Sequence, residues 1–425
     1  MSNQFSKEER VAFEDILEGF NDALVLSRNV SVYRGMNDAE MERSNNIFWR
    51  PMPYIVPSYD GTDQTTNFRS LTQLSVPATI GFQKSVPLQM SSTELRDALQ
   101  EKRLGDSAKQ RLASDINLAV MNVAANQGTL FVKRTASASG FDDVAACEAI
   151  FNEQGIPGND RYIALSTRDY NNMASNLAAS TRSFGNATSE DALRRAYVGN
   201  VASFETYKLD YAVRKTAAAG GAGITINTLV AGANYYAPKA TSVSATGETS
   251  NVDNRFQTIT VSSTTNVVAG DAFTIANCEA VHHITKTSTG QLKTFRVISV
   301  PSATTLVISP PIISNQGGSI AEVQYQNCTF TATASNAAIV FLNTVTATVN
   351  PFWQKDALEI IPGRYAMPIG AGADILRGST DQGLEVVMSK QYDIKTANTF
   401  MRLDTFFGVV NKQPQMSGVI MFGQT

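Results

Sequence analysis

The sequence predicts an α+β protein in which a long all-β segment interrupts a region of alternating helices and strands. Three observations lead to this prediction. Amphipathic helical patterns occur in the first third of the chain. Helix and strand patterns then alternate up to about residue 219. A Thr- and Ser-rich segment follows, in which strand patterns are separated by turn signals.

The composition limits the classes of function. With 425 residues the chain is long enough for two or three domains. Only 17% of the residues are charged, against roughly 25% in a typical globular protein. Such a low charge density fits a surface covered by partners, and equally a large core. The net charge of −3 argues against strong nucleic-acid binding, which requires clustered Lys and Arg.

Residues suited to catalysis or metal binding are scarce. The two histidines, His282 and His283, are neighbours, and on a strand they would point to opposite faces of the sheet. The three cysteines lack metal-ligand spacing, and their use suits a reducing cytoplasm. Neither glycine cluster fits a phosphate-binding loop, and no G-x-S-x-G motif is present. We therefore expect no catalytic, metal or cofactor site.

Targeting signals are equally absent from the sequence pattern. The first ten residues, MSNQFSKEER, are polar and do not form a secretory signal. No apolar run reaches the length that a membrane span requires. No membrane partner is expected.

Residues 1–44 are predicted to form an N-terminal arm with an acidic amphipathic helix. Its apolar residues recur at helical spacing: Phe13, Ile16, Leu17, Phe20 and Leu24. Acidic residues, among them Glu14, Asp15 and Glu18, lie on the other side. The pattern is typical of an ordinary surface helix, and also of a helix that presents its acidic face to a basic partner.

Residues 45–90 are predicted to form an extended arm. Prolines recur through it and exclude a helix: Pro51, Pro53, Pro57, Pro77 and Pro87. Partly alternating runs indicate a long hairpin with its tip at 59–67. Because a hairpin of this length is poorly stable alone, the arm is expected to lie on another surface. Phe48 and Trp49 are predicted to anchor the base of the arm in an apolar site on the subunit's own core.

A helical region and an α/β region follow the arm. Ser91 and Glu94 form a capping box. The helical pattern breaks at Gly105, and a second, longer helix is predicted over about 106–127. Alternating helices and strands over 138–220 predict the first part of an α/β domain.

The segment 221–345 is predicted to be an inserted all-β barrel domain, because short strand patterns recur between turn signals. Within it, the stretch 240–256 begins with small polar residues that cannot bury themselves, so we predict a mobile exposed loop. The α/β pattern resumes over 346–384. Long strands close the chain over 385–425, with a hairpin turn predicted at 411–415.

The order of these parts resembles the major capsid (coat) proteins of tailed bacteriophages, which share one fold with the herpesvirus capsid floor. It is most similar to the coat proteins of short-tailed lambdoid phages, which carry an inserted β-barrel domain. The matching stretches are RSNNIFWRPM, ELRDALQEKR, NVDNRF, NPFWQKDALEI and GVIMFGQT. They occur in the same order over essentially the whole chain, and the similarity is weakest over 135–219.

The resemblance implies a structural protein and not an enzyme. Such proteins assemble into pentamers and hexamers of an icosahedral procapsid that matures around packaged double-stranded DNA. It implies a peripheral domain from 91–137, with a spine helix, and 385–425. It also implies an axial domain from 138–220 and 346–384. A separate scaffolding protein, a portal protein at one vertex and weak contact with the packaged DNA are the expected partners. Assembly is expected in the host cytoplasm.

The resemblance also implies roles for two sets of residues. The acidic residues Glu14, Asp15 and Glu18 are expected to bind the scaffolding protein. The loop in the inserted domain is expected to bridge neighbouring capsomers through Lys239, Glu248, Asp253 and Arg255.

A different class remains open from the residues alone. A β-rich, Thr- and Ser-rich insert also suits an adhesin or a carbohydrate-binding component of a virion or tail. The long arm argues against this alternative, because it suits neither a compact module nor a fibrous trimer. The alternative predicts a small defined oligomer, whereas a coat protein should polymerise into shells.

Overall fold

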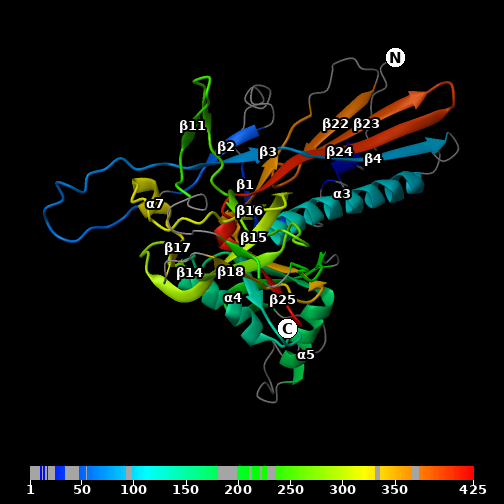
Figure 1. Ribbon diagram of the computed structural model, residues 1–425. Helices are drawn as coiled ribbons and strands as arrows, with labels where there is room; N and C mark the ends of the chain where they lie inside the picture. The colour runs from blue at the N-terminus through cyan, green and yellow to red at the C-terminus, as the bar shows by residue number, and fades with distance from the viewer. Residues whose placement is uncertain are drawn as a thin grey trace. The chain divides into compact units, whose positions relative to one another are not determined.

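The computed structural model (Figure 1) describes residues 10–11, 13–14, 17, 24–33, 47–53, 55–91, 98–179, 199–209, 213–220, 223–226, 236–330, 336–365 and 373–425. For residues 98–105 and 176–179 only the backbone is described. The chain divides into two compact units. Unit 1 comprises Met1–Phe48, Ala78–Asn122 and Leu358–Val410, and unit 2 comprises Trp49–Pro77, Val123–Ala357 and Asn411–Thr425.

Unit 1 is organised by one sheet. Its strands follow the order β1 (Ser31–Val32), β21 (Leu358–Pro362), β24 (Asn398–Asn411), β23 (Glu385–Asp393) and β22 (Asp374–Ser379), and β4 (Phe82–Ser91) also pairs with β24. The β4–β24 ladder runs from Ser91 opposite Asn398 to Phe82 opposite Phe407. At its end the rings of Phe82 and Phe407 stack with centroids 5.4 Å apart. The resemblance implied an axial segment over 346–384, but β21 and β22 within it belong to this sheet.

The N-terminal helix packs on that sheet. Its described residues between 10 and 17 are helical, and Phe13 is buried whereas Glu14 is exposed. A Cβ added at Gly378 in β22 would lie 2.8 Å from Leu17 Cδ2 and 3.0 Å from Phe13 Cε1. The apolar side of the helix therefore contacts β22, and Glu14 faces away from this contact. Asp15 and Glu18 lie outside the described residues.

The spine helix α3 runs without interruption over Ala98–Gln127. Its 30 residues correspond to about 45 Å at about 1.5 Å per residue. The predicted break at Gly105 is wrong, because a single glycine inside a helix costs only about 1 kcal/mol. A buried stripe that includes Leu112, Ile116 and Val120 compensates for it. Glu94 of the predicted capping box lies outside the described residues.

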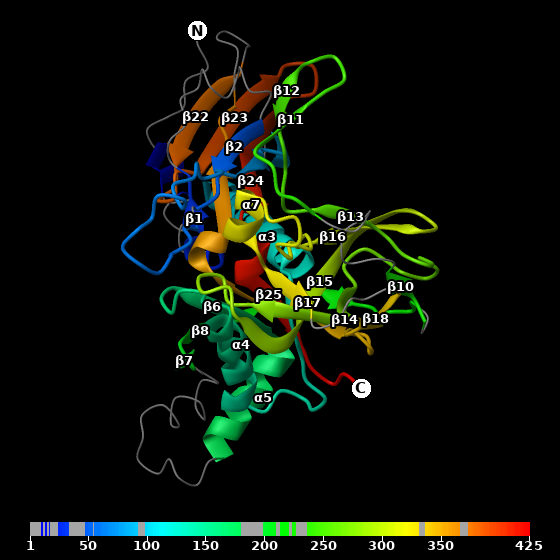
Figure 2. The same ribbon diagram turned by 60° about the vertical axis from the view of Figure 1, so that its left-hand side comes forward.

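Unit 2 contains an α/β sheet. Its strand order is β5 (Leu130–Lys133), β25 (Ser417–Met421), β20 (Asn350–Gln354), β6 (Arg161–Ser166), β8 (Phe204–Leu209) and β7 (Asn200–Val201). Helices α4 (Phe141–Glu153) and α5 (Thr167–Ala179) pack against it, as Figure 2 shows. The rings of Phe151, Phe204 and Phe352 form the aromatic centre of the core beneath these helices.

The last strand corrects one prediction. A short 3-10 turn at Pro414–Met416 follows β24, but β25 does not fold back on β24 as a hairpin. It pairs in parallel with β5 and antiparallel with β20. All five residues of β25 are buried, so both of its faces need cover. A central position in the α/β sheet provides that cover, and local turn chemistry gave no sign of it.

A second sheet of unit 2 closes on itself. Its path is β10 (Thr225–Ile226), β18 (Ala337–Phe341), β14 (Ala272–Val281), β15 (Ser288–Ser302), β16 (Thr305–Ser309) and β13 (Gln257–Thr260), with β17 (Cys328–Phe330) beside β14. Ile226 bridges to Val261, directly after β13. The Ser262 amide donates to the Thr225 carbonyl at 2.9 Å. We call this path the closed sheet; its interior holds Phe273, Phe295 and Ile308 among other buried residues.

The extended arm pairs at its base, and its last residues form β4, which pairs with β24. Strands β2 (Ile47–Pro51) and β3 (Ser75–Thr79) pair, and the described residues between them form no strand. Met52 and Ile55 pack against a cluster of Leu74, Ile313 and Tyr325. The Thr72 amide donates to Gln324 Oε1 at 3.0 Å, and the Tyr325 hydroxyl donates to the Thr72 carbonyl at 3.0 Å. This cluster anchors the base of the arm.

The predicted anchor is therefore misplaced. Trp49 is 38% exposed and Phe48 is half-buried. Alternate residues of β2 are exposed, and Trp49 falls on the exposed side together with Ile47 and Pro51. The fully buried tryptophan is Trp353 in β20, with 1% of its surface exposed.

These burial values predict losses of stability of very different size when each tryptophan is replaced by alanine. Trp353→Ala should lower the free energy of unfolding by about 3–5 kcal/mol, because it leaves a large cavity. Trp49→Ala should lower it by less than about 1 kcal/mol, as is usual at exposed positions. Urea titration of the unassembled subunit measures both. Equal losses for the two variants would contradict the burial difference.

Candidate assembly surfaces

The predicted mobile loop of the inserted segment is a hairpin. Strands β11 (Thr241–Val243) and β12 (Thr249–Asn251) pair antiparallel, and every residue of the two strands is exposed (Figure 1). The Ser244 amide donates to the Glu248 carbonyl at 2.8 Å, and Gly247 adopts a φ of +85°. Side chains this polar cannot form a core, but a tight turn and a short ladder need none. Exposure is confirmed for 241–251, and this part of the predicted loop forms a paired hairpin.

A buried asparagine fixes the root of the hairpin. Asn254 is 5% exposed. Its Nδ2 donates to the Lys239 carbonyl at 2.8 Å, and its Oδ1 accepts from the Lys239 amide at 3.0 Å. The Tyr236 hydroxyl donates to the same oxygen at 2.9 Å. One side chain thus joins the two ends of the hairpin. Asn254 carries no charge, so the charge pattern around Asp253 and Arg255 in the stretch NVDNRF did not indicate its role.

The four residues predicted for contact between capsomers fall into two pairs. Lys239 and Glu248 are exposed. Asp253 and Arg255 pair with each other, with Arg255 Nη2 2.7 Å from Asp253 Oδ2. The Arg255 guanidinium also donates to the Asn411 carbonyl at 3.0 Å and lies 5.0 Å from the Phe256 ring centroid. Asp253 and Arg255 therefore hold the root of the hairpin within the subunit.

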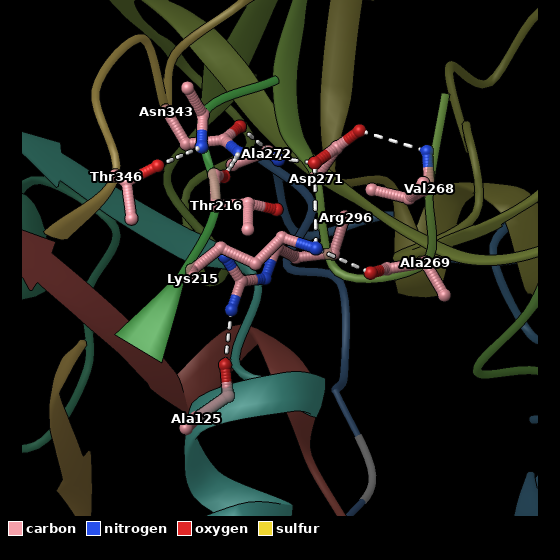
Figure 3. A network of polar contacts seen from close by, with 11 residues as sticks. Ala125, Lys215, Thr216, Val268, Ala269, Asp271, Ala272, Arg296, Asn343 and Thr346 are labelled. Carbon is pink, nitrogen blue, oxygen red and sulfur yellow. Dashed lines mark hydrogen bonds and ion pairs between the residues drawn. The ribbon is translucent and has the colours of Figure 1, made fainter. Parts of the chain in front are cut away.

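A buried carboxylate lies where the closed sheet joins the α/β sheet. The joining segments include β9 (Arg214–Lys215) and β19 (Ala347–Thr348), which pair with each other. Asp271 is 0% exposed. Its Oδ1 accepts from Asn343 Nδ2 at 3.0 Å and lies 3.5 Å from Lys215 Nζ, as Figure 3 shows. Its Oδ2 accepts from the Val268 amide at 3.0 Å. One carboxylate thus contacts both joining segments.

Arg296 adds a buried cation to the same network. It is 2% exposed, and its Nη2 donates to the Ala125 carbonyl in the last turn of α3 (Figure 3). Its Nε and Nη1 have no hydrogen-bond partner among the described residues. Burial lowers the pKa of Arg296 to about 10, and the Asp271 charge opposes that shift. Burial likewise lowers the pKa of Lys215, against the opposing charge of Asp271.

His282 and His283 were considered as strand residues, but they lie beyond the end of β14 at Val281. The His283 amide donates to the Gln154 carbonyl at 3.0 Å. Burial, with Lys293, Lys286 and His282 nearby, lowers the pKa of His283 to about 3, so its ring is neutral. Within the described parts of the chain, no three His, Cys, Asp or Glu side chains are grouped to hold a metal ion. No helix within these parts combines the length and apolar character of a membrane span.

Comparison with known proteins identifies the chain as a bacteriophage coat protein, which is a structural protein. The family model described as "P22 coat protein - gene protein 5" matches residues 1–423. The chain therefore belongs to the P22 coat protein family.

Several solved structures are similar to this chain. Mycobacterium phage Che8 is 9% identical, with 93% of this chain and 90% of that chain covered and a TM-score of 0.43. The capsid of the cyanophage P-SCSP1u is 11% identical, with 93% and 86% covered and a TM-score of 0.44. The CUS-3 coat protein I-domain is 38% identical, with 29% and 98% covered and a TM-score of 0.22.

The junction between the two sheets generates a prediction with two opposite outcomes. Asp271→Ala should lower the free energy of unfolding by about 3–5 kcal/mol, because Lys215 and Asn343 lose a buried partner. Arg296→Met should be neutral or stabilising, because it removes two unpartnered N–H groups and keeps an apolar stem. Urea titration measures both. A loss for Arg296→Met as large as that for Asp271→Ala would contradict this account.

Proposed function

We propose that this coat protein assembles, with a separate scaffolding protein, into the pentamers and hexamers of an icosahedral procapsid. The procapsid incorporates a portal protein at one vertex and matures in the host cytoplasm around packaged double-stranded DNA, which the coat contacts weakly. The observation that carries the proposal is the family match over residues 1–423. Family membership makes the chain a subunit of a virion shell, which associates with copies of itself.

We assign the structural parts to domains on the same basis. The sheet of unit 1 and the spine helix α3 form the peripheral domain, and the α/β sheet forms the axial domain. The closed sheet is the inserted barrel domain. The second axial part expected over 346–384 is taken as shortened in this assignment, because β21 and β22 belong to the sheet of unit 1.

The arm supports assembly through contact with a neighbour. Between Met52 and Leu74 it carries apolar side chains that its own subunit leaves exposed, of which Phe68 is 87% exposed. Exposing so many apolar groups in one segment is unfavourable in water and typical of an interaction site. The tip at 59–67 has hydrogen bonds only within itself among those described, such as Gln64 Nε2 to the Gly61 carbonyl at 2.6 Å. The tip is therefore free to lie on a second subunit.

The acidic helix supports binding of the scaffolding protein. Glu14 is exposed, whereas the neighbouring Phe13 packs toward β22. We place Asp15 and Glu18 on the same scaffold-binding surface. Each exposed ion pair would contribute only about 0.2–1 kcal/mol, so the complex would be reversible and sensitive to salt. Reversibility suits a scaffold that must leave the shell.

Removing the three acids should uncouple assembly from the scaffold. The triple variant Glu14→Ala, Asp15→Ala, Glu18→Ala should fold normally but fail to form procapsids when mixed with the scaffolding protein. Circular dichroism checks folding, and sedimentation with electron microscopy checks assembly. A matched control replaces the exposed acids Asp142 and Glu153 of α4 by Ala and should assemble as the unaltered chain does. Assembly of the triple variant at control levels would refute the role.

The β11–β12 hairpin supports a contact between capsomers across a two-fold axis. It pairs only with itself among the described strands, so its own subunit does not need it for packing. Its charged exposed positions are Lys239 at the root and Glu248 in the turn. In a two-fold contact, Lys239 of one copy would meet Glu248 of the other, and the reverse pair would form as well. Asp253 and Arg255 would hold the hairpin at the correct angle.

A charge exchange tests this contact. Lys239→Glu and Glu248→Lys should each yield fragile or aberrant shells, because each places like charges together. The double variant should recover normal shells, because it restores both pairs with exchanged sign. Deletion of Ser242–Thr249 should give tubes or aberrant particles from subunits whose thermal melting is unchanged. Normal shells from the deletion variant would leave the hairpin without this role.

A further inference from the structure

Unit 2 contains an apolar cavity of about 410 Å³. Its wall is made by Met52 and Ile55 at the base of the arm, by Ile313 and Tyr325, and by Met416 before β25. A volume of roughly 300–1,000 Å³ with mostly apolar walls is typical of sites for small molecules. Asn254 and Arg255 at the root of the β11–β12 hairpin also line it, but neither the exposed part of the hairpin nor the tip of the arm does.

One wall of the cavity is polar and incompletely paired. His283 lines it, and His283 Nε2 is buried without a hydrogen-bond partner among the described residues. Gln415 lines the same cavity, and its Oε1 accepts from Lys293 Nζ at 2.8 Å. Buried polar atoms are almost always paired, so an unpaired one beside a cavity indicates a missing hydrogen-bonding group.

Positive charge accumulates beyond this wall. Lys293 is 0% exposed, and Lys286 Nζ donates to the Gln326 carbonyl at 3.1 Å. Within the described ranges neither lysine has an ion pair with a carboxylate. Burial lowers the pKa of each lysine to about 8. For Lys286 the nearby charge of Lys293 lowers the pKa further. A buried cation without a counter-charge is costly, and here the buried Lys293 lies near the half-buried Lys286.

One kind of ligand would match the apolar cavity, its polar wall and the two cations. We propose that the cavity binds a small amphipathic carboxylate with a medium-length unbranched alkyl chain. The chain fills the space between Met52 and Ile313. The carboxylate lies at the wall of His283 and Gln415, where it accepts a hydrogen bond from the neutral imidazole and balances Lys286 and Lys293.

A series of ligands on the unaltered subunit tests chain and head group separately. Hexanoate, octanoate and decanoate are titrated by calorimetry below the concentrations at which they aggregate. Each added methylene should tighten binding by about fourfold until the cavity is full. Decan-1-ol should bind at least tenfold more weakly than decanoate, and decyltrimethylammonium more weakly still. No binding of decanoate at millimolar concentration, or equal binding of the cation, would overturn the proposal.

Two variants locate the site. Lys293→Met should weaken decanoate at least tenfold, leave decan-1-ol unchanged and raise the melting temperature of the unliganded subunit, because it removes a buried charge. Met52→Trp, at a half-buried position, should weaken the acid and the alcohol together by filling the cavity. Lys395→Met, at an exposed lysine, is the matched control and should change nothing. Unchanged decanoate affinity in both test variants would place binding elsewhere and refute the site. If Lys293→Met does not fold, Met52→Trp and the ligand series still decide.

Discussion

The buried carboxylate of Asp271 is the interaction on which unit 2 most depends. The closed sheet is joined to the α/β sheet by two segments, and Asp271 contacts Lys215 in one and Asn343 in the other. Because the carboxylate is fully buried, it depends on these partners for its hydrogen bonds and its counter-charge. The junction is therefore defined by charge and hydrogen bonding, and not by apolar packing alone.

The subunit of a shell combines well-packed parts with segments that have few contacts within the subunit. The well-packed parts are the closed sheet and the α/β sheet, whose cores hold fully buried aromatic residues. The hairpin β11–β12 and the arm have little packing of their own, but their roots are fixed, by Asn254 and by the cluster around Tyr325. In the contacts proposed for them, fixed roots would limit the directions in which the hairpin and the arm can reach, which would reduce the entropic cost of binding.

The sequence predicted well wherever a local pattern was sufficient. Helical periodicity predicted a buried Phe13 and an exposed Glu14, and the structure confirms both. The polar character of 241–251 correctly predicted exposure. It did not predict the β11–β12 ladder, because short Thr and Ser strands carry no apolar alternation to reveal them. Gly105 shows the opposite error, since a residue that disfavours helix was outweighed by packing along α3.

The sequence by itself determined the family, the α+β class and the order of the parts, because short-range patterns and matching stretches encode them. Only the tertiary structure decided which tryptophan is buried, that β25 joins β5 and β20, and that Lys286 and Lys293 lie behind the wall of one apolar cavity. These properties depend on residues far apart in the chain. The pairing of a strand and the burial of a charge depend on the residues that the fold places beside them. The local hydrophobic periodicity of the sequence does not contain this information.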